Sequence, residues 1–135
     1  MPDKTKWVNE WKQKAENDLR TAEIVLSSEE PPTDTICFHA QQCAEKYLKS
    51  YLTSKDITIE KTHDLTRINN ICIGVDPDFQ ELSEFAELLS GYAVEIRYPG
   101  DFIECSIGEA KEAVEMAKSF KNLVLRKLNV DGSSP

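Results

Sequence analysis

Three side chains in this sequence have the chemistry for catalysis or for binding an anion. The 135 residues include two histidines, His39 and His63, and each stands in a short polar stretch. Imidazole changes its protonation near neutral pH, so it serves as a general acid, a general base or a metal ligand. A third polar stretch, EIRYPGDF, contains Arg97, whose guanidinium suits bidentate binding of phosphate. His39, His63 and Arg97 are therefore the candidate catalytic residues.

The stretch around His39 has the spacing of one helical face. His39, Gln42, Lys46 and Lys49 follow one another at intervals of three and four residues. This spacing places the four side chains in one polar stripe along a helix. The stripe can bind an anion or the edge of a base, or it can be an ordinary solvated face. The spacing alone favours the solvated face.

The other two stretches also have structural interpretations. Asp64 can cap a helix that starts after it, so capping geometry accounts for His63 more simply than catalysis does. Arg97 falls in the last turn of an expected helix, where a cation offsets the negative end of the helix dipole. Tyr98 precedes Pro99 and is held towards an extended conformation. On spacing alone, Arg97 is as suited to pairing with a carboxylate as to binding a ligand.

Several kinds of site are not indicated by the sequence. There is no glycine-rich phosphate loop, no H-E-x-x-H and no repeated Glu-x-x-His pair. The four cysteines form no C-x-x-C motif, and Cys37 and Cys43 are expected to pack as small apolar residues. We therefore expect no metal site and no cofactor.

Helices must position these residues, because apolar side chains recur every three or four positions along most of the chain. The stretch KDITIEKT is β-branched, but no second strand is available for it, so it is expected to be a loop. Ser106 and Glu109 have the spacing of a capping box. The expected helices cover about Thr5–Ser27, Thr33 or Asp34 to Ser54, a short helix opened by Asp64, about Phe79–Tyr98, and a last helix from about Ser106.

This pattern predicts an all-α fold, an up-and-down bundle of four long helices plus one short helix. Residues 1–130 are expected to form a single domain, and residues 131–135 a disordered tail. No apolar run is long enough to cross a bilayer, and the N-terminus lacks the apolar stretch of a signal peptide, so we expect a cytoplasmic protein without membrane contact. The net charge of −8 disfavours general affinity for nucleic acid, although a local basic site remains compatible with it.

Five short stretches occur in a characteristic order and together cover nearly the whole chain. They are W-x-x-x-A-x-x-D-L-x-x-A (Trp11 to Ala22), C-F-H-A-Q-Q-C-A-E-K-Y-L-K-S-Y-L (Cys37 to Leu52), T-H-D-L (Thr62 to Leu65), R-Y-P-G-D (Arg97 to Asp101) and E-A-x-E-A-V-E-x-A (Glu109 to Ala117). In this combination the sequence resembles the HEPN family, the higher eukaryotes and prokaryotes nucleotide-binding domain.

The resemblance implies a helical bundle that forms a homodimer, encoded beside a minimal nucleotidyltransferase as a two-component or toxin–antitoxin pair. It also implies a nucleotide or RNA ligand, with nucleotide-binding candidates His39, Gln42, Lys46, His63, Arg97 and Tyr98. Many members are metal-independent RNases whose motif is an Arg followed, after four to six residues, by a His. Here Arg97 is followed by Y-P-G-D-F-I-E-C, which contains no histidine.

This departure leads to two functional hypotheses. The first is a non-enzymatic module whose dimer binds a nucleotide or a polynucleotide end near Arg97 and docks the nucleotidyltransferase. The alternative is an RNase toxin with a rearranged site that combines Arg97 with His39 or His63.

The sequence allows two interpretations of His39 and two of the aromatic residues near the end of the fourth expected helix. His39 either lines a groove between the second and fourth helices, with Gln41 or Gln42 and Lys46 beside it, or completes a buried polar network with a glutamine. The aromatic residues Tyr92, Tyr98 and Phe102 are candidates for the dimer contact, or they are internal.

Overall fold

The structure, a computed structural model, describes residues 3–59, 61–92 and 105–130. In this part of the chain every regular element is helical. The elements are α1 (Lys4–Leu26), α2 (Thr33–Ser54), α3 (Leu65–Val75), the 3₁₀ helix η1 (Pro77–Leu82), α4 (Ser83–Ser90) and α5 (Ile107–Val130). The expected all-α bundle is therefore confirmed.

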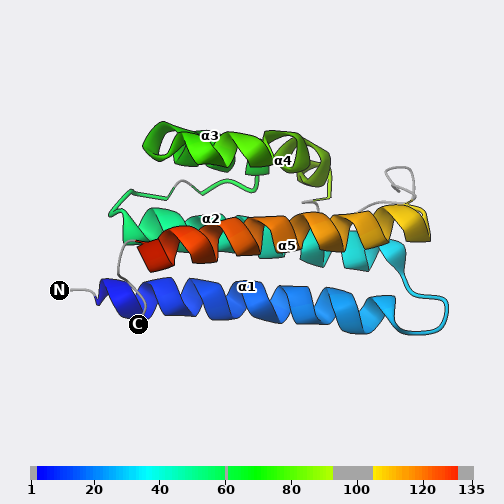
Figure 1. Cartoon of the computed structure of the whole chain (residues 1–135). Helices are drawn as coiled ribbons and strands as arrows, with labels where there is room; N and C mark the ends of the chain where they lie inside the picture. Colours follow the sequence, from blue (N-terminus) through cyan, green and yellow to red (C-terminus); the bar gives the residue numbers. More distant parts are fainter. Residues whose placement is uncertain (1–2, 60, 93–104, 131–135) are drawn as a thin grey trace.

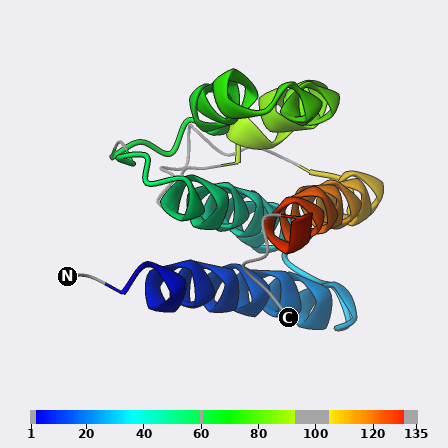
Figure 2. The same ribbon diagram turned by 60° about the vertical axis from the view of Figure 1, so that its left-hand side comes forward.

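The helices form three layers, with α2 and α5 side by side in the middle (Figures 1 and 2). Helix α1 covers one side of this middle layer, and α3 with α4 covers the opposite side. Helices α2 and α5 run in the same direction, antiparallel to α1 (Figure 1). Consequently the ends of α2 and α5 lie at the same end of the molecule as the start of α1.

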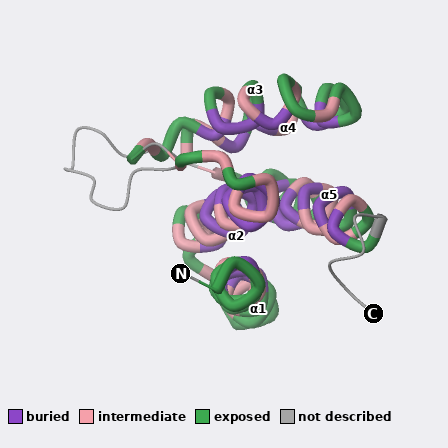
Figure 3. Tube along the Cα trace, turned by 90° about the vertical axis from the view of Figure 1, so that its left-hand side faces the viewer, coloured by how far each residue is buried: buried purple, intermediate pink, exposed green. Residues whose placement is uncertain are grey.

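Helix α2 is the most enclosed element, because it has neighbours on three sides (Figure 3). Its apolar stripe packs against Ala15, Leu19 and Ala22 of α1 and against the apolar face of α5. Several polar side chains of α2 are buried along with that stripe. Burial of this kind is tolerated when the polar groups find hydrogen-bonding partners, so the contacts of these side chains decide what α2 can do.

The helix ends follow from local capping residues. Asp3 accepts a hydrogen bond from the Lys6 N–H at the start of α1, and Asp64 accepts one from the Arg67 N–H at the start of α3. At the start of α5, the Ser106 hydroxyl accepts from the Glu109 N–H at 3.0 Å. The Glu109 carboxylate accepts from the Ser106 N–H at 3.1 Å, which completes the predicted capping box.

The fourth predicted helix differs from the expectation at its start. Residues Pro77–Leu82 form a 3₁₀ helix, and α4 begins only at Ser83. The Asp76 side chain accepts a hydrogen bond from the Asp78 N–H. This bond fixes a tight turn around Pro77. Helix α4 ends at Ser90, and the predicted continuation to Tyr98 falls mostly outside the described residues.

Smaller predictions concern the KDITIEKT stretch, the cysteines, membrane-spanning helices and the C-terminal tail. The residues of KDITIEKT that are described, all but Glu60, form no strand. Cys37 and Cys43 are fully buried, and all four cysteines are free thiols. In the described ranges no helix is long and apolar enough to span a membrane. The tail, residues 131–135, lies outside the described residues.

Candidate functional site

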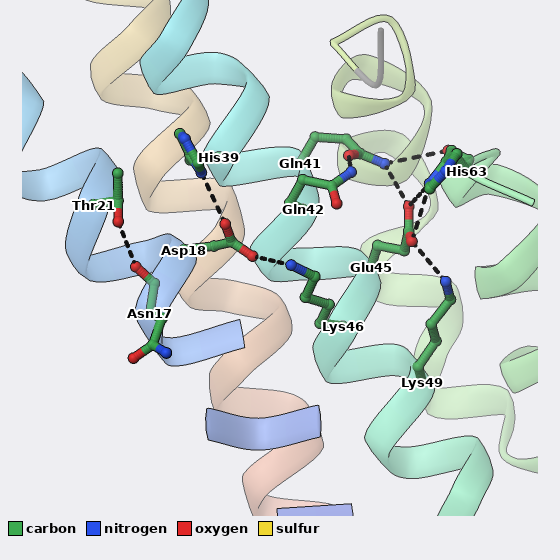
Figure 4. A network of polar contacts seen from close by, with 10 residues as sticks. All are labelled: Asn17, Asp18, Thr21, His39, Gln41, Gln42, Glu45, Lys46, Lys49 and His63. Atoms are coloured by element: carbon green, nitrogen blue, oxygen red, sulfur yellow. Dashed lines mark hydrogen bonds and ion pairs between the residues drawn. The ribbon is translucent and has the colours of Figure 1, made fainter. Parts of the chain in front are cut away.

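The first polar cluster joins α1 to α2 and is centred on Asp18 of α1 (Figure 4). His39 donates from Nδ1 to Asp18 Oδ1 at 2.8 Å, and Lys46 donates from Nζ to Asp18 Oδ2 at 2.6 Å. Asp18 is 11% exposed, whereas His39 and Lys46 keep 27% and 24% of their side chains in solvent. We call these three residues the Asp18 cluster.

The environment of Asp18 keeps its carboxylate ionised. Burial by itself raises the pKa of this carboxyl, because it disfavours the charged form. The hydrogen bonds from His39 and Lys46, together with their positive charge, outweigh burial, so the pKa of Asp18 lies below its usual value. An ionised Asp18 accepts a hydrogen bond from the His39 Nδ1–H, and whenever the ring is neutral its Nε2 carries a free lone pair.

The second polar cluster is centred on Glu45 of α2 and faces the segment before α3 (Figure 4). Glu45 accepts from Lys49 Nζ at 2.7 Å, from Gln41 Nε2 at 3.2 Å and from His63 Nδ1 at 3.1 Å. Gln41 also donates to the backbone carbonyl of His63 at 3.2 Å. Glu45, Gln41 and Lys49 are buried, but the His63 side chain is 69% exposed. We call Gln41, Glu45, Lys49 and His63 the Glu45 cluster.

The two histidines are held on different sides of α2 (Figure 4). His39 points towards α1, which covers one side of the middle layer, and His63 precedes α3, which covers the other side. The structure therefore brings His39 together with Lys46, and it places His63 with Glu45 in a separate cluster. Within one chain the two imidazoles do not line a common site.

The polar stripe predicted on α2 is divided between these clusters. Gln42 is 9% exposed and donates to Gln41 Oε1 at 2.7 Å. Lys49 is 8% exposed, and besides pairing with Glu45 it lies over the Trp11 ring at 5.3 Å from the ring centre. The solvated-face interpretation is wrong for these two residues, because both are buried. Among the described residues, the hydrogen-bonding partner of His39 is Asp18 of α1, and not a residue of the fourth helix or a glutamine.

Arg97 and Tyr98 lie outside the described residues, as does Phe102. The chain on either side of them is described. Thr66 N–H donates to Ser90 Oγ at 3.2 Å, so the end of α4 lies beside the start of α3, close in sequence to His63. After the gap, the Cys105 carbonyl accepts from Thr33 Oγ1 at 2.8 Å at the start of α2. Tyr92 is partly buried against the core.

Sequence reasoning missed the two carboxylates that organise these clusters. Asp18 follows Ala15 by three residues and precedes Ala22 by four, so it interrupts the apolar stripe of its own helix. Glu45 lies four residues after Gln41 and four before Lys49, which is the spacing of helical side-chain neighbours. For Asp18, a charged residue within an apolar stripe was the available signal, but its partners are 21 and 28 residues away in the sequence. For Glu45, the spacing to Gln41 and Lys49 was available, whereas His63 is 18 residues away.

Both clusters present an imidazole with the same arrangement. In each case a carboxylate holds Nδ1, and in the described part of the chain no protein group is hydrogen bonded to Nε2. Such a ring can accept a hydrogen bond or a proton from a ligand at Nε2. No group of three or more His, Cys, Asp or Glu residues with the geometry of a metal site occurs among the described residues.

The family model "HEPN domain" matches residues 8–128. The chain belongs to the HEPN family. A comparison with curated proteins finds no match.

Two solved structures resemble this HEPN chain over most of their length. One is TT1696 from Thermus thermophilus, with a TM-score of 0.74 and 25% identity, covering 90% of this chain and 98% of that one. The other is ST0689, described as an archaeal HEPN homologue, with a TM-score of 0.71 and 24% identity, covering 90% of this chain and 97% of that one. The HEPN match extends over the segment that contains Arg97, where the sequence lacks the histidine of the usual RNase motif.

Proposed function

We propose that this HEPN protein is a non-catalytic binding subunit. As a homodimer it binds a nucleotide near Arg97 and docks a minimal nucleotidyltransferase encoded beside it, in a two-component or toxin–antitoxin pair. The observation that supports the absence of catalysis is the placement of the histidines. No histidine follows Arg97 at the spacing of the RNase motif, and His39 and His63 are held by carboxylates on different sides of α2.

The proposed nucleotide site combines Arg97 and Tyr98 with His63. His63 is the imidazole chosen for this site because it precedes α3, whose start lies beside the end of α4 through the hydrogen bond from Thr66 to Ser90. Its side chain is 69% exposed, and its Nε2 can bond a base or a phosphate. Arg97 would supply the charge for the phosphates and Tyr98 a stacking surface. His39 and Lys46, in the Asp18 cluster, would contribute only to a nucleotide bound against α1. Gln42 donates to Gln41 and belongs to neither cluster.

The nucleotide site is tested by calorimetry with ATP, GTP and AMP on the purified chain. We expect binding of at least one nucleotide, and Arg97→Ala should weaken it roughly tenfold, because one charge-assisted contact is lost. Arg126→Ala is the matched control, since Arg126 is an exposed arginine of α5 that reaches Glu81 at 3.6 Å. Equal affinity of the wild type and Arg97→Ala, with unchanged helix content, would refute the site.

The enzymatic alternative is separated from this proposal by an RNA cleavage assay without divalent metal. We expect no cleavage by the wild-type chain. Cleavage that disappears in His39→Ala or His63→Ala would instead establish the RNase with a rearranged site. The solution mass of the chain, measured alone and with the neighbouring nucleotidyltransferase, tests the homodimer and the docking.

A further inference from the structure

A pocket lined by lysines lies at the end of the bundle where α1 starts and where α2 and α5 end. It is the left-hand end in Figure 1. Lys4 and Lys12 of α1 and Lys55, which follows α2, line a hollow of about 150 Å³. The buried side chains Val8 and Leu128 also line it. We call this hollow the lysine pocket.

The charge of the lysine pocket is opposite to that of the whole chain. The chain has a net charge of −8, yet the charged residues that line the pocket are three lysines, without a carboxylate among them. Among the described residues, Lys12 has no hydrogen-bonding or ion-pair partner. Lys4 contacts the exposed Asp56 at 3.2 Å, an ion pair with little effect on stability. Ion pairing therefore does not explain why Lys4 and Lys12 converge on one hollow.

Helix dipoles explain only one of the three lysines. Lys55 follows the end of α2, where a cation is favourable. Lys4 is the first residue of α1, and the positive end of a helix dipole disfavours a cation there. The capping residue Asp3 and the ion pair with Asp56 offset part of this charge, but neither carboxylate lines the pocket.

The remaining groups and the size of the pocket indicate the class of ligand. The side chains of Thr5, Asn9 and Ser54 also line it, and they supply hydroxyl and amide groups. The volume is below the ~300 Å³ at which pockets begin to enclose a drug-sized ligand. A phosphate group fits these features, because lysines bind phosphate as point charges and neutral donors complete its hydrogen bonds.

We propose that the lysine pocket binds a phosphate group, either as a free inorganic anion or as the terminal phosphate of a phosphorylated molecule. None of the residues that line the pocket belongs to the proposed nucleotide site. The pocket lies at the end of α5, far from the described start of that helix. The occupant would bind with its phosphate among the lysines and the rest of the molecule outside.

The proposal is tested with pyrophosphate on the purified full-length chain. In NMR titrations we expect shifts of the backbone amides of Thr5, Asn9 and Ser54, which come from two different helices. Lys12→Gln should weaken the affinity roughly tenfold through the loss of one ammonium contact. Lys14→Gln is the matched control, because it removes the same charge from an exposed position of α1 outside the pocket.

Two results would overturn the proposal. One is the absence of these amide shifts at millimolar pyrophosphate. The other is an equal loss of affinity in Lys12→Gln and Lys14→Gln, which would indicate a general effect of charge. A 5′-phosphorylated ribo-oligonucleotide, compared with the same oligonucleotide carrying a 5′-hydroxyl, distinguishes a terminal phosphate from the free anion as the preferred occupant. Arg97→Ala should retain pyrophosphate binding, so failure of the nucleotide site and failure of the lysine pocket give different results.

Discussion

Asp18 shows how one side chain can fix the contact between two helices. It stands within the apolar stripe of α1, and it is nearly buried when α2 packs against it. A buried carboxylate is costly unless it is paired and hydrogen bonded, and His39 and Lys46 supply both kinds of interaction. The register of α1 on α2 is therefore set by a charged contact as well as by apolar packing.

Asp18→Asn should lower the free energy of unfolding by about 1–3 kcal/mol at pH 7, because it removes the charge that pairs with Lys46 and His39. The effect should depend on pH in a definite direction. The pKa of Asp18 is lower in the folded chain than in the unfolded chain. Its contribution is thus fully present above the unfolded pKa, near 4, and is lost as the pH falls from there through the folded pKa.

Urea denaturation at pH 7, 5 and 3 measures this dependence. The stability difference between the wild type and Asp18→Asn should shrink as the pH falls towards 3. Glu10→Gln is the control, since Glu10 is an exposed acidic residue of the same helix. A difference between wild type and Asp18→Asn that stays constant across the three pH values would contradict the prediction.

At the scale of residues, the sequence predicted the helical face of several polar side chains but not their partners. His39, Gln42, Lys46 and Lys49 were recognised as one stripe from their spacing. Spacing gives the face of a helix but not the element that covers that face. Local periodicity could reveal the contact of Glu45 with Lys49, four residues on, but not the contacts of Asp18 with His39 or of Glu45 with His63, which are distant in sequence.

At the scale of elements, capping residues account for how closely the helix ends were predicted. Helices α1, α2 and α5 each begin or end within about a residue of the expected position, because Pro31, Pro32 and Ser106 are local signals. The start of the fourth helix was less predictable. Its 3₁₀ turn depends on the hydrogen bond from the Asp78 N–H to the Asp76 side chain. A turn of this kind leaves no distinctive apolar period in the sequence.

Ser106→Ala tests the capping box that starts α5. The substitution removes the hydroxyl that accepts from the Glu109 N–H, and we expect the free energy of unfolding to fall by about 1 kcal/mol. Ser119→Ala is the control, because the Ser119 hydroxyl bonds a carbonyl in the interior of the same helix. Urea denaturation compares the two variants, and an equal effect of both substitutions would show that the cap does not contribute.

At the scale of the whole molecule, the three layers enclose three of the four cysteines. Cys37, Cys43 and Cys72 are fully buried, whereas Cys105 is partly exposed at the start of α5. Burial raises the pKa of the Cys72 thiol to about 12, and burial together with the neighbouring Cys105 raises the pKa of Cys37 to about 12. Thiols that are both covered and protonated react poorly with electrophiles.

We therefore expect the folded chain to react with an aromatic disulfide reagent at pH 8 through Cys105 alone. The other three thiols should react only after denaturant is added. Absorbance of the released thiolate counts the reacting groups, and Cys105→Ser should remove the rapid phase. Rapid reaction of a second thiol in the folded chain would mean that the layers open more readily than their packing indicates.

The separation of the two histidines across α2 has a practical consequence for spectroscopy. A chain with only two imidazoles gives two sets of ring proton resonances in an NMR spectrum. One set belongs to a ring that touches α1, and the other belongs to a ring beside the entry to α3. Each resonance is thus a built-in reporter for one of the two outer layers. Titration of the unlabelled protein would reveal which layer a bound partner disturbs.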